Sequence, residues 1–124
     1  MPVLPRPIAP THEIPGASFT SLATPTTGSV DTAVWEVRLE PGHAGVPHEL
    51  TRQEVFVITS GNGRASIAGV DHAVRAGDVV VVPSATQFRL ESSVDEPLVA
   101  LCCFPTDGKA VLGGTEPFTP PWAI

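Results

Sequence analysis

The sequence predicts an all-β domain, a sandwich or barrel of short antiparallel strands. Fourteen prolines and eleven glycines are spread over its 124 residues, and no segment shows the 3.6-residue periodicity of an amphipathic helix. In addition, about nine short β-rich runs follow one another closely, each ended by a turn signal. Because 42% of the residues are hydrophobic, the chain can fill one core, and a single domain is expected.

The N-terminal third contains an arm and the clearest strand. Residues 1–16 are expected to form a proline-rich arm that is too broken by proline to become a regular element. Residues 17–23 alternate weakly between apolar and polar side chains and end in a polar turn. In 31–40 every second residue from Trp35 to Leu39 is apolar, so this run is expected to be a strand with one face in the core.

The middle of the chain carries a run that is rich in β-formers on both faces. This run is 54–60, and it follows a short predicted strand around 47–50. We expect it to be covered twice, by the core and by another sheet or subunit. A hairpin around Gly69–Asp71 follows the turn signal at 61–63. The remaining predicted strands are 77–83, 86–92 and 97–104.

The C-terminal segment lacks a regular pattern. Residues 106–124 are expected to be a loop-like tail, and Phe118 and Trp122 are expected to anchor it to the body. The predicted organisation is therefore an arm over 1–16, a barrel over 17–105 and this tail.

The net charge and the two cysteines indicate which partners can be excluded and in which cell compartment the protein is expected. Thirteen acidic against seven basic residues give a net charge of −6, which argues against nucleic acid and anionic membranes as partners. Prolines interrupt the first residues, so no signal peptide is expected, and no apolar run is long enough to span a membrane. Cys102 and Cys103 are adjacent and should point to opposite strand faces, as small hydrophobic residues without a mutual disulfide. A cytoplasmic location is expected.

Two segments of the chain each contain a set of positions whose residues and spacings can be compared with known sequence motifs. In PGHAGVPHELTRQEVFVITSG the spaced positions are Gly42, His48, Leu50, Glu54 and Gly61. In AGDVVVVPSATQFRLES they are Gly77, Pro83, Ala85, Phe88 and Ser92. Over residues 31–105 this arrangement resembles the two motifs of the cupins. The resemblance implies a double-stranded β-helix, the cupin jelly-roll barrel of antiparallel sheets.

The resemblance also implies a metal site, which this sequence fills incompletely. The cupin pattern has three imidazoles and one carboxylate pointing into the barrel, a set suited to Fe, Mn, Ni or Zn. Here His48 and Glu54 remain, whereas Leu50 and Phe88 stand in the other two ligand places. Residues 48 and 50 share a strand face, so leucine occupies the ligand's own place. Two protein ligands rarely hold a transition metal tightly.

Other residues could complete the site, but each has a simpler interpretation. His43 lies in a loop and could fold over the barrel mouth, although an exposed loop position is expected. His12 lies in the arm, where a solvated position is expected, and His72 is predicted on the surface. Gln87 would reach the interior only if a bulge turned it inward.

Two hypotheses about function follow. The first is an apolar pocket for a small molecule, with His48 and Glu54 as its polar end; they could hydrogen-bond each other, fix a ligand, or act as base and acid in an isomerisation or cyclisation. The expected pocket residues are Trp35, Leu50, Phe56, Gln87 and Phe88. A structural His–carboxylate pair without function is also consistent with the sequence. The second hypothesis is a metal-dependent enzyme of the oxygenase or isomerase type, which binds its metal through His48, Glu54 and unidentified ligands.

A homodimer is expected as well. The doubly apolar run 54–60 and the proline-rich arm are both explained if two subunits pack sheet on sheet and exchange arms, which the resemblance also implies.

Overall fold

The fold of residues 3–124, described by a computed structural model, is all-β, as predicted. The larger sheet contains, in spatial order, β1 (His12–Ile14), β2 (Ala17–Ala23), β3 (Thr32–Leu39), β10 (Leu98–Pro105), β5 (Glu54–Ser60) and β8 (Val79–Val82). The smaller sheets are β7 (Val70–Arg75), β6 (Asn62–Ile67) and β9 (Phe88–Ser92), and β11 (Ala110–Val111) with β4 (Glu49–Leu50). Two short 3-10 helices are η1 (Pro25–Thr27) and η2 (Pro121–Ala123). Within residues 3–124 no helix is long and apolar enough to cross a membrane.

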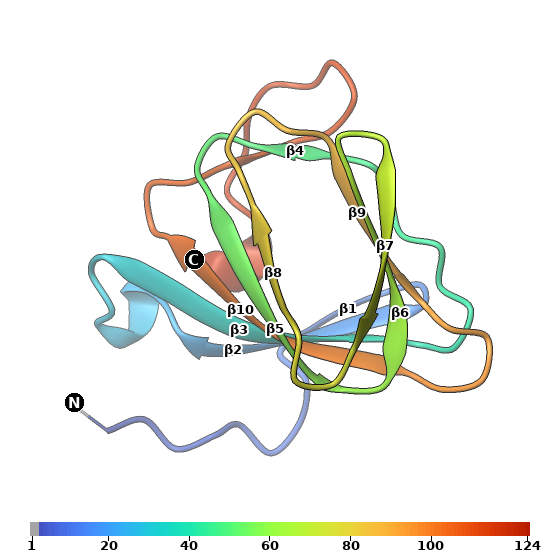
Figure 1. The fold of residues 1–124 in the computed structure, drawn as a ribbon. Coiled ribbons are helices and arrows are strands. Elements are labelled where there is room, and N and C mark those ends of the chain that lie inside the picture. Colours follow the sequence, from blue (N-terminus) through green and yellow to red (C-terminus); the bar gives the residue numbers. More distant parts are fainter. Residues whose placement is uncertain (1–2) are drawn as a thin grey trace.

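The two main sheets form the opposite walls of a jelly-roll barrel (Figure 1). Neighbouring strands in every sheet pair antiparallel. An isolated bridge between His48 and Phe88 extends β9 toward β4, with N–H to carbonyl distances of 3.0 and 2.9 Å. This bridge brings residues from the two motifs side by side.

Strict alternation of side chains fills the barrel interior. In β3, Ala33, Trp35, Val37 and Leu39 are buried, and the residues between them face outward. Strand β10 repeats the pattern with Leu98, Ala100, Cys102 and Phe104. The predicted hairpin is also present, with its turn at Ala68 and Gly69.

The N-terminal arm is more ordered than predicted. Residues 12–14 form β1 and pair with β2, so the expectation of an arm without any regular element is wrong. The run between Pro10 and Pro15 contains no proline, and its N–H groups can therefore join a sheet; the N–H of Thr11 already donates to Phe19 O at 2.9 Å. Residues 3–10 form no helix or strand, and Arg6 forms an ion pair with Glu36 of β3 at 2.7 Å.

Three motif glycines adopt left-handed backbone conformations at turns. The φ angles are +77° at Gly42, +82° at Gly61 and +97° at Gly77. Ala85, which stands in the place of a motif glycine, also has a positive φ of 56°. An L-residue with a Cβ is strained in this region, so the backbone path is kept here although the glycine is not.

Candidate functional site

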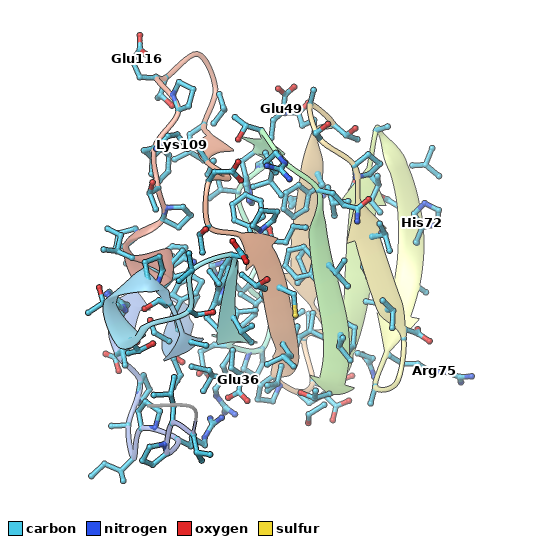
Figure 2. The ribbon with its side chains drawn as sticks, turned by 90° about the vertical axis from the view of Figure 1, so that its left-hand side faces the viewer. Glu36, Glu49, His72, Arg75, Lys109 and Glu116 are labelled. Carbon is cyan, nitrogen blue, oxygen red and sulfur yellow. The ribbon has the colours of Figure 1, made fainter. Side chains whose placement is uncertain are left out.

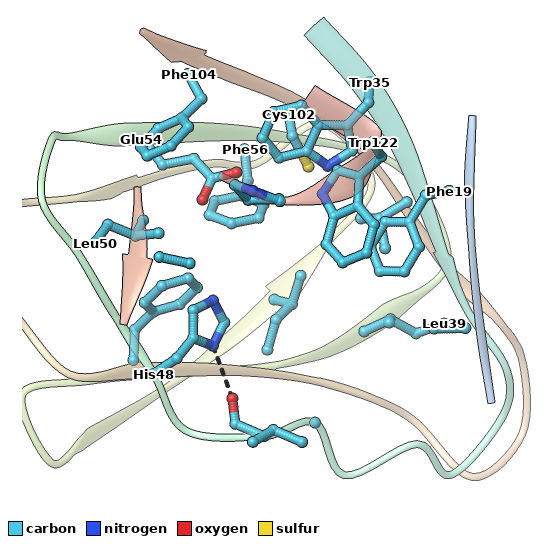
Figure 3. A pocket seen from close by; sticks show the side chains of 18 of the residues that line it. Phe19, Trp35, Leu39, His48, Leu50, Glu54, Phe56, Cys102, Phe104 and Trp122 are labelled. Atoms are coloured by element: carbon cyan, nitrogen blue, oxygen red, sulfur yellow. Dashed lines mark hydrogen bonds between the residues drawn. The ribbon is translucent and has the colours of Figure 1, made fainter. Parts of the chain in front are cut away.

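The barrel encloses one large apolar cavity of about 250 Å³ between its sheets. Strands β2, β3, β5 and β10, the segment before β4 and the C-terminal tail all contribute to its walls. Seven aromatic side chains line it: Phe19, Trp35, Phe56, Phe88, Phe104, Phe118 and Trp122. The tail closes one side, because the indole of Trp122 stacks on Phe19 with ring centroids 3.6 Å apart (Figure 3). This wall is held by a hydrogen bond of 2.7 Å from Ser21 Oγ to the carbonyl oxygen of Trp122.

A single carboxyl group faces this cavity. Glu54 begins β5 on its inner face and is only 3% exposed. Within residues 3–124 no hydrogen bond or ion pair reaches its carboxyl oxygens. Burial raises the pKa of Glu54 from 4.5 to about 8. The group is therefore mainly an uncharged carboxylic acid at pH 7.

The imidazole of His48 lies on another wall of the same cavity. Its Nδ1 is 2.8 Å from the carbonyl oxygen of Val46. Because a carbonyl can only accept, Nδ1 carries the hydrogen and Nε2 keeps its lone pair. Burial lowers the pKa of His48, which favours this neutral form. The ring packs on Phe88 with centroids 4.3 Å apart.

The two polar residues face the cavity from separate walls, as Figure 3 shows. Among the hydrogen bonds of residues 3–124, His48 bonds to Val46, and none joins it to Glu54. The sequence-based alternative of a self-satisfied His–carboxylate pair is therefore wrong for this structure. An unprotonated nitrogen and a protonated carboxyl both remain free to meet a ligand.

Leu50 and Phe88, which stand in the two altered ligand places, point into the barrel as the motif spacing predicted. Leu50 and Phe88 are 3% and 4% exposed, and both line the cavity. In the described part of the chain no group of three His, Cys, Asp or Glu residues could hold a metal ion. Two donors, with apolar side chains in the other two ligand places, do not fit a resident transition metal.

The remaining candidate residues divide between the cavity and the surface. Trp35 and Phe56 line the cavity, and so does His43, whose loop is held by Ser92: Ser92 Oγ accepts from His43 N at 3.0 Å and donates to Glu40 O. Gln87 is exposed and absent from the cavity walls, so its inclusion in the pocket is wrong. Phe88 starts β9 on the inner face, and no bulge turns Gln87 inward.

Histidines 12 and 72 lie outside the cavity. His12 is in β1, where its Nδ1 lies 2.9 Å from the hydroxyl of Thr11. His72 is exposed on β7 and points away from the body of the protein (Figure 2).

Sequence reasoning missed several wall residues. Four further residues complete the aromatic lining: Phe19, Phe104, Phe118 and Trp122. The aromatic pair in the tail motif EPFTPPW was the available signal for the last two. Cys102 also lines the cavity as a free cysteine, and burial together with nearby Glu54 raises the pKa of its thiol. It therefore stays protonated and behaves as a small apolar residue.

Comparisons with known proteins agree with this architecture. None of the curated proteins matches the chain. Among solved structures it is similar to KdgF of Halomonas sp., with 20% identity, a TM-score of 0.68, and coverage of 78% of this chain and 86% of that one. It is also similar to the polyketide cyclase RemF of Streptomyces resistomycificus, at 12% identity and TM-score 0.73, covering 82% and 73%. Salicylate 1,2-dioxygenase of Pseudoaminobacter salicylatoxidans matches at 20% identity and TM-score 0.70, covering 90% of this chain and 31% of that one.

These structural likenesses show the fold, and the family follows from the sequence itself. A family model described as a cupin domain matches residues 35–104, more than half of the chain. The match spans both motifs, from the inner face of β3 through Glu54 and Phe88 to the end of β10. The chain therefore belongs to the cupin family.

Proposed function

We propose that this cupin binds a small, largely apolar molecule in its barrel cavity and recognises the polar group of that molecule through His48 and Glu54. The observation that carries the proposal is the carboxyl of Glu54, buried in an apolar cavity with no partner in the described chain. A buried polar group without a partner costs stability. A ligand that supplies the missing partner would remove this cost.

The size and lining of the cavity support a ligand of this kind. A cavity of about 150 Å³ can hold benzene, and this one measures about 250 Å³. Its walls are apolar apart from His43, His48 and Glu54. An apolar cavity with a few convergent polar groups is how small-molecule sites usually look.

The same two residues are suited to proton transfer. The unprotonated Nε2 of His48 can accept a proton from an acidic C–H, whereas Glu54 can meet the developing charge as an acid or as a counterion. Such a pair would suit an isomerisation or a cyclisation, in which protons only change place within the substrate. A polyketide cyclase is among the structural neighbours, and at 12% identity it supports the fold alone.

Native mass spectrometry of the untagged protein tests the proposal. We expect a bound small molecule, or a ligand found by screening, whose binding is weakened in Glu54→Gln and His48→Gln. Gln87→Ala is the matched control, because Gln87 is exposed and lies outside the cavity. If neither purification nor screening yields a cavity ligand, or if both cavity variants bind as the wild type does, the proposal is wrong.

We also propose that two copies pack through the outer face of β5 and β8. Val79 and Val81 are 57% and 50% exposed and pair with the half-buried Val57 and Val55. The arm adds further exposed apolar residues, with Ile8 fully exposed. A second copy would cover both features.

Size-exclusion chromatography with light scattering tests the assembly at micromolar concentration. We expect a dimer for the wild type and for Val30→Lys, whose side chain is 77% exposed at a different site. We expect a monomer for the double variant Val79→Lys and Val81→Lys. A monomeric wild type would contradict the proposal.

Free cysteines support the expectation of a cytoplasmic protein. Cys102 and Cys103 are adjacent, and neither forms a disulfide. Reduced cysteines are the rule in reducing compartments. We propose this location, and a fusion to a fluorescent protein imaged in the producing cell would test it.

A further inference from the structure

Resting on the proposed function, we propose that the ligand is an organic cation, an amine or quaternary ammonium group on an apolar body, for which Glu54 is the counterion. The reasons are the isolation of the carboxyl, the position of every basic side chain and the aromatic walls.

The chain keeps all its own strong cations away from the cavity. It has seven Lys and Arg residues, and none of them lines the cavity. Five of them form ion pairs on the outer surface: Arg6, Arg38, Arg52, Arg64 and Arg89. Lys109 bonds to Thr119 at 3.1 Å, and Arg75 is exposed on β7 (Figure 2). A strong cation opposite an ionised Glu54 must therefore come from the ligand, whereas an anionic ligand would meet no Lys or Arg side chain on these walls.

No Lys or Arg side chain faces Glu54 across the described cavity. On the neighbouring strand β10 the titratable residue is Cys102, a buried thiol. On the other neighbour, β8, the inward residues are Val80 and Val82. Across the cavity His48 is held as a neutral imidazole by its bond to Val46, and His43 is the remaining titratable residue of the wall.

The aromatic walls favour a cation. The faces of aromatic rings carry partial negative charge, and seven rings line the space around this carboxyl. A desolvated cation on such a face gains on the order of 30-fold in affinity per contact. Entering the cavity costs the cation its hydration and requires Glu54 to ionise, so the ion pair with this carboxylate and the contacts with several rings together must outweigh these two costs. A neutral ligand gains only one hydrogen bond, on the order of fivefold.

If the bound cation is a substrate, Glu54 and His48 have different roles in the reaction. The proton of Glu54 leaves to solvent as the cation enters, and the carboxylate then holds the ligand's charge. His48 remains as the base, facing a C–H that the neighbouring positive charge makes more acidic.

A matched pair of probes tests this inference. Benzyltrimethylammonium carries a permanent charge, and neopentylbenzene has the same shape without it. We expect isothermal titration or NMR shift titration of the full chain at pH 7.5 to show at least tenfold tighter binding of the cation. Glu54→Gln should lose this preference and still bind neopentylbenzene, which also shows that the variant is folded. Glu36→Gln is the control, since it removes a carboxylate on the outer face of β3.

The outcomes separate this inference from the function on which it rests. If the wild type binds neopentylbenzene as tightly as the cation, or if Glu54→Gln keeps the cation preference, the inference is overturned and the small-molecule site stands. If neither probe binds and no other cavity ligand is found, both are overturned.

Discussion

Two glutamates of the same sheet occupy opposite environments. Glu36 lies on the outer face of β3 and is held by both guanidinium nitrogens of Arg6, at 2.7 and 3.3 Å. Figure 2 shows it beside the N-terminal arm. Glu54 lies on the inner face of β5, two strands away across β10, and has no cation near it in the described chain. The outer carboxylate is satisfied by the chain itself, whereas the inner one has no protein partner among residues 3–124.

The two glutamates also differ in what their loss should do to the protein. An exposed ion pair such as that of Glu36 adds little to stability and can be lost without consequence. A buried carboxyl without a protein partner costs stability, and this cost is the basis of the ligand that we propose for Glu54. The following predictions test this contrast from the largest expected effect to the smallest.

Rebuilding the missing ligands should turn the inner carboxyl into part of a metal site. We expect the double variant Leu50→His and Phe88→His to bind one Zn²⁺ or Ni²⁺ per chain after dialysis, because position 88 pairs with His48 and position 50 faces the same cavity. The wild type is expected to retain none, as measured by elemental analysis.

The matched control for this experiment is Gln87→His, which adds a histidine on the exposed neighbour of Phe88. Because the Phe88 substitution alters a packed core position, Leu50→His alone serves as a second variant with three donors. Stoichiometric metal in the wild type that disappears in His48→Ala would favour the metal-dependent alternative instead.

The contribution of Glu54 to stability should fall as pH rises from 5 to 8. The pKa of Glu54 is raised from 4.5 to about 8 in the folded state, so the folded protein binds this proton more tightly than the unfolded chain does. Its contribution to stability is full below pH 4.5 and is lost as pH rises through 8. The lowered pKa of His48 acts in the opposite direction in both the wild type and Glu54→Gln. In urea unfolding, the stability of the wild type relative to Glu54→Gln should therefore decrease by about 3 kcal/mol over this range.

Glu54→Gln should lack this slope, since its amide does not titrate. Glu36→Gln should keep it, because the inner carboxyl is unchanged. Parallel pH profiles for the wild type and Glu54→Gln would show that burial does not shift the proton equilibrium of this residue.

Removing the outer ion pair should have the smallest effect. In Arg6→Ala we expect an unfolding midpoint within experimental error of the wild type, since the pair is exposed and screened by solvent. Differential scanning calorimetry measures this. A clear decrease would mean that the arm stabilises the barrel, and the contrast between the two glutamates would then be weaker.

Local patterns were sufficient to predict most of the barrel. Period-two alternation placed Trp35 and Phe56 on inner faces, and the motif spacing placed Leu50 and Phe88 beside His48. Each of these depends on residues close in sequence or on a spacing shared by the whole family.

Features that depend on how distant segments meet were not predictable. The strand β1 forms because residues 12–14 happen to reach the edge of β2. Trp122 stacks on Phe19, more than a hundred positions earlier, and no local pattern specifies that return. The separation of His48 from Glu54 across the cavity is likewise a property of the closed barrel.

The adjacent cysteines of β10 provide the molecule with two built-in chemical labels. Cys102 is buried at the cavity, whereas Cys103, the next residue, is half-buried on the outer face beside Val55. An alkylating reagent too large for the cavity would modify Cys103 alone and report whether the outer face is covered. Cys102 keeps its proton behind the cavity wall, so the same reagent should modify it only when the barrel opens. One dipeptide can thus record events on both surfaces of the same sheet.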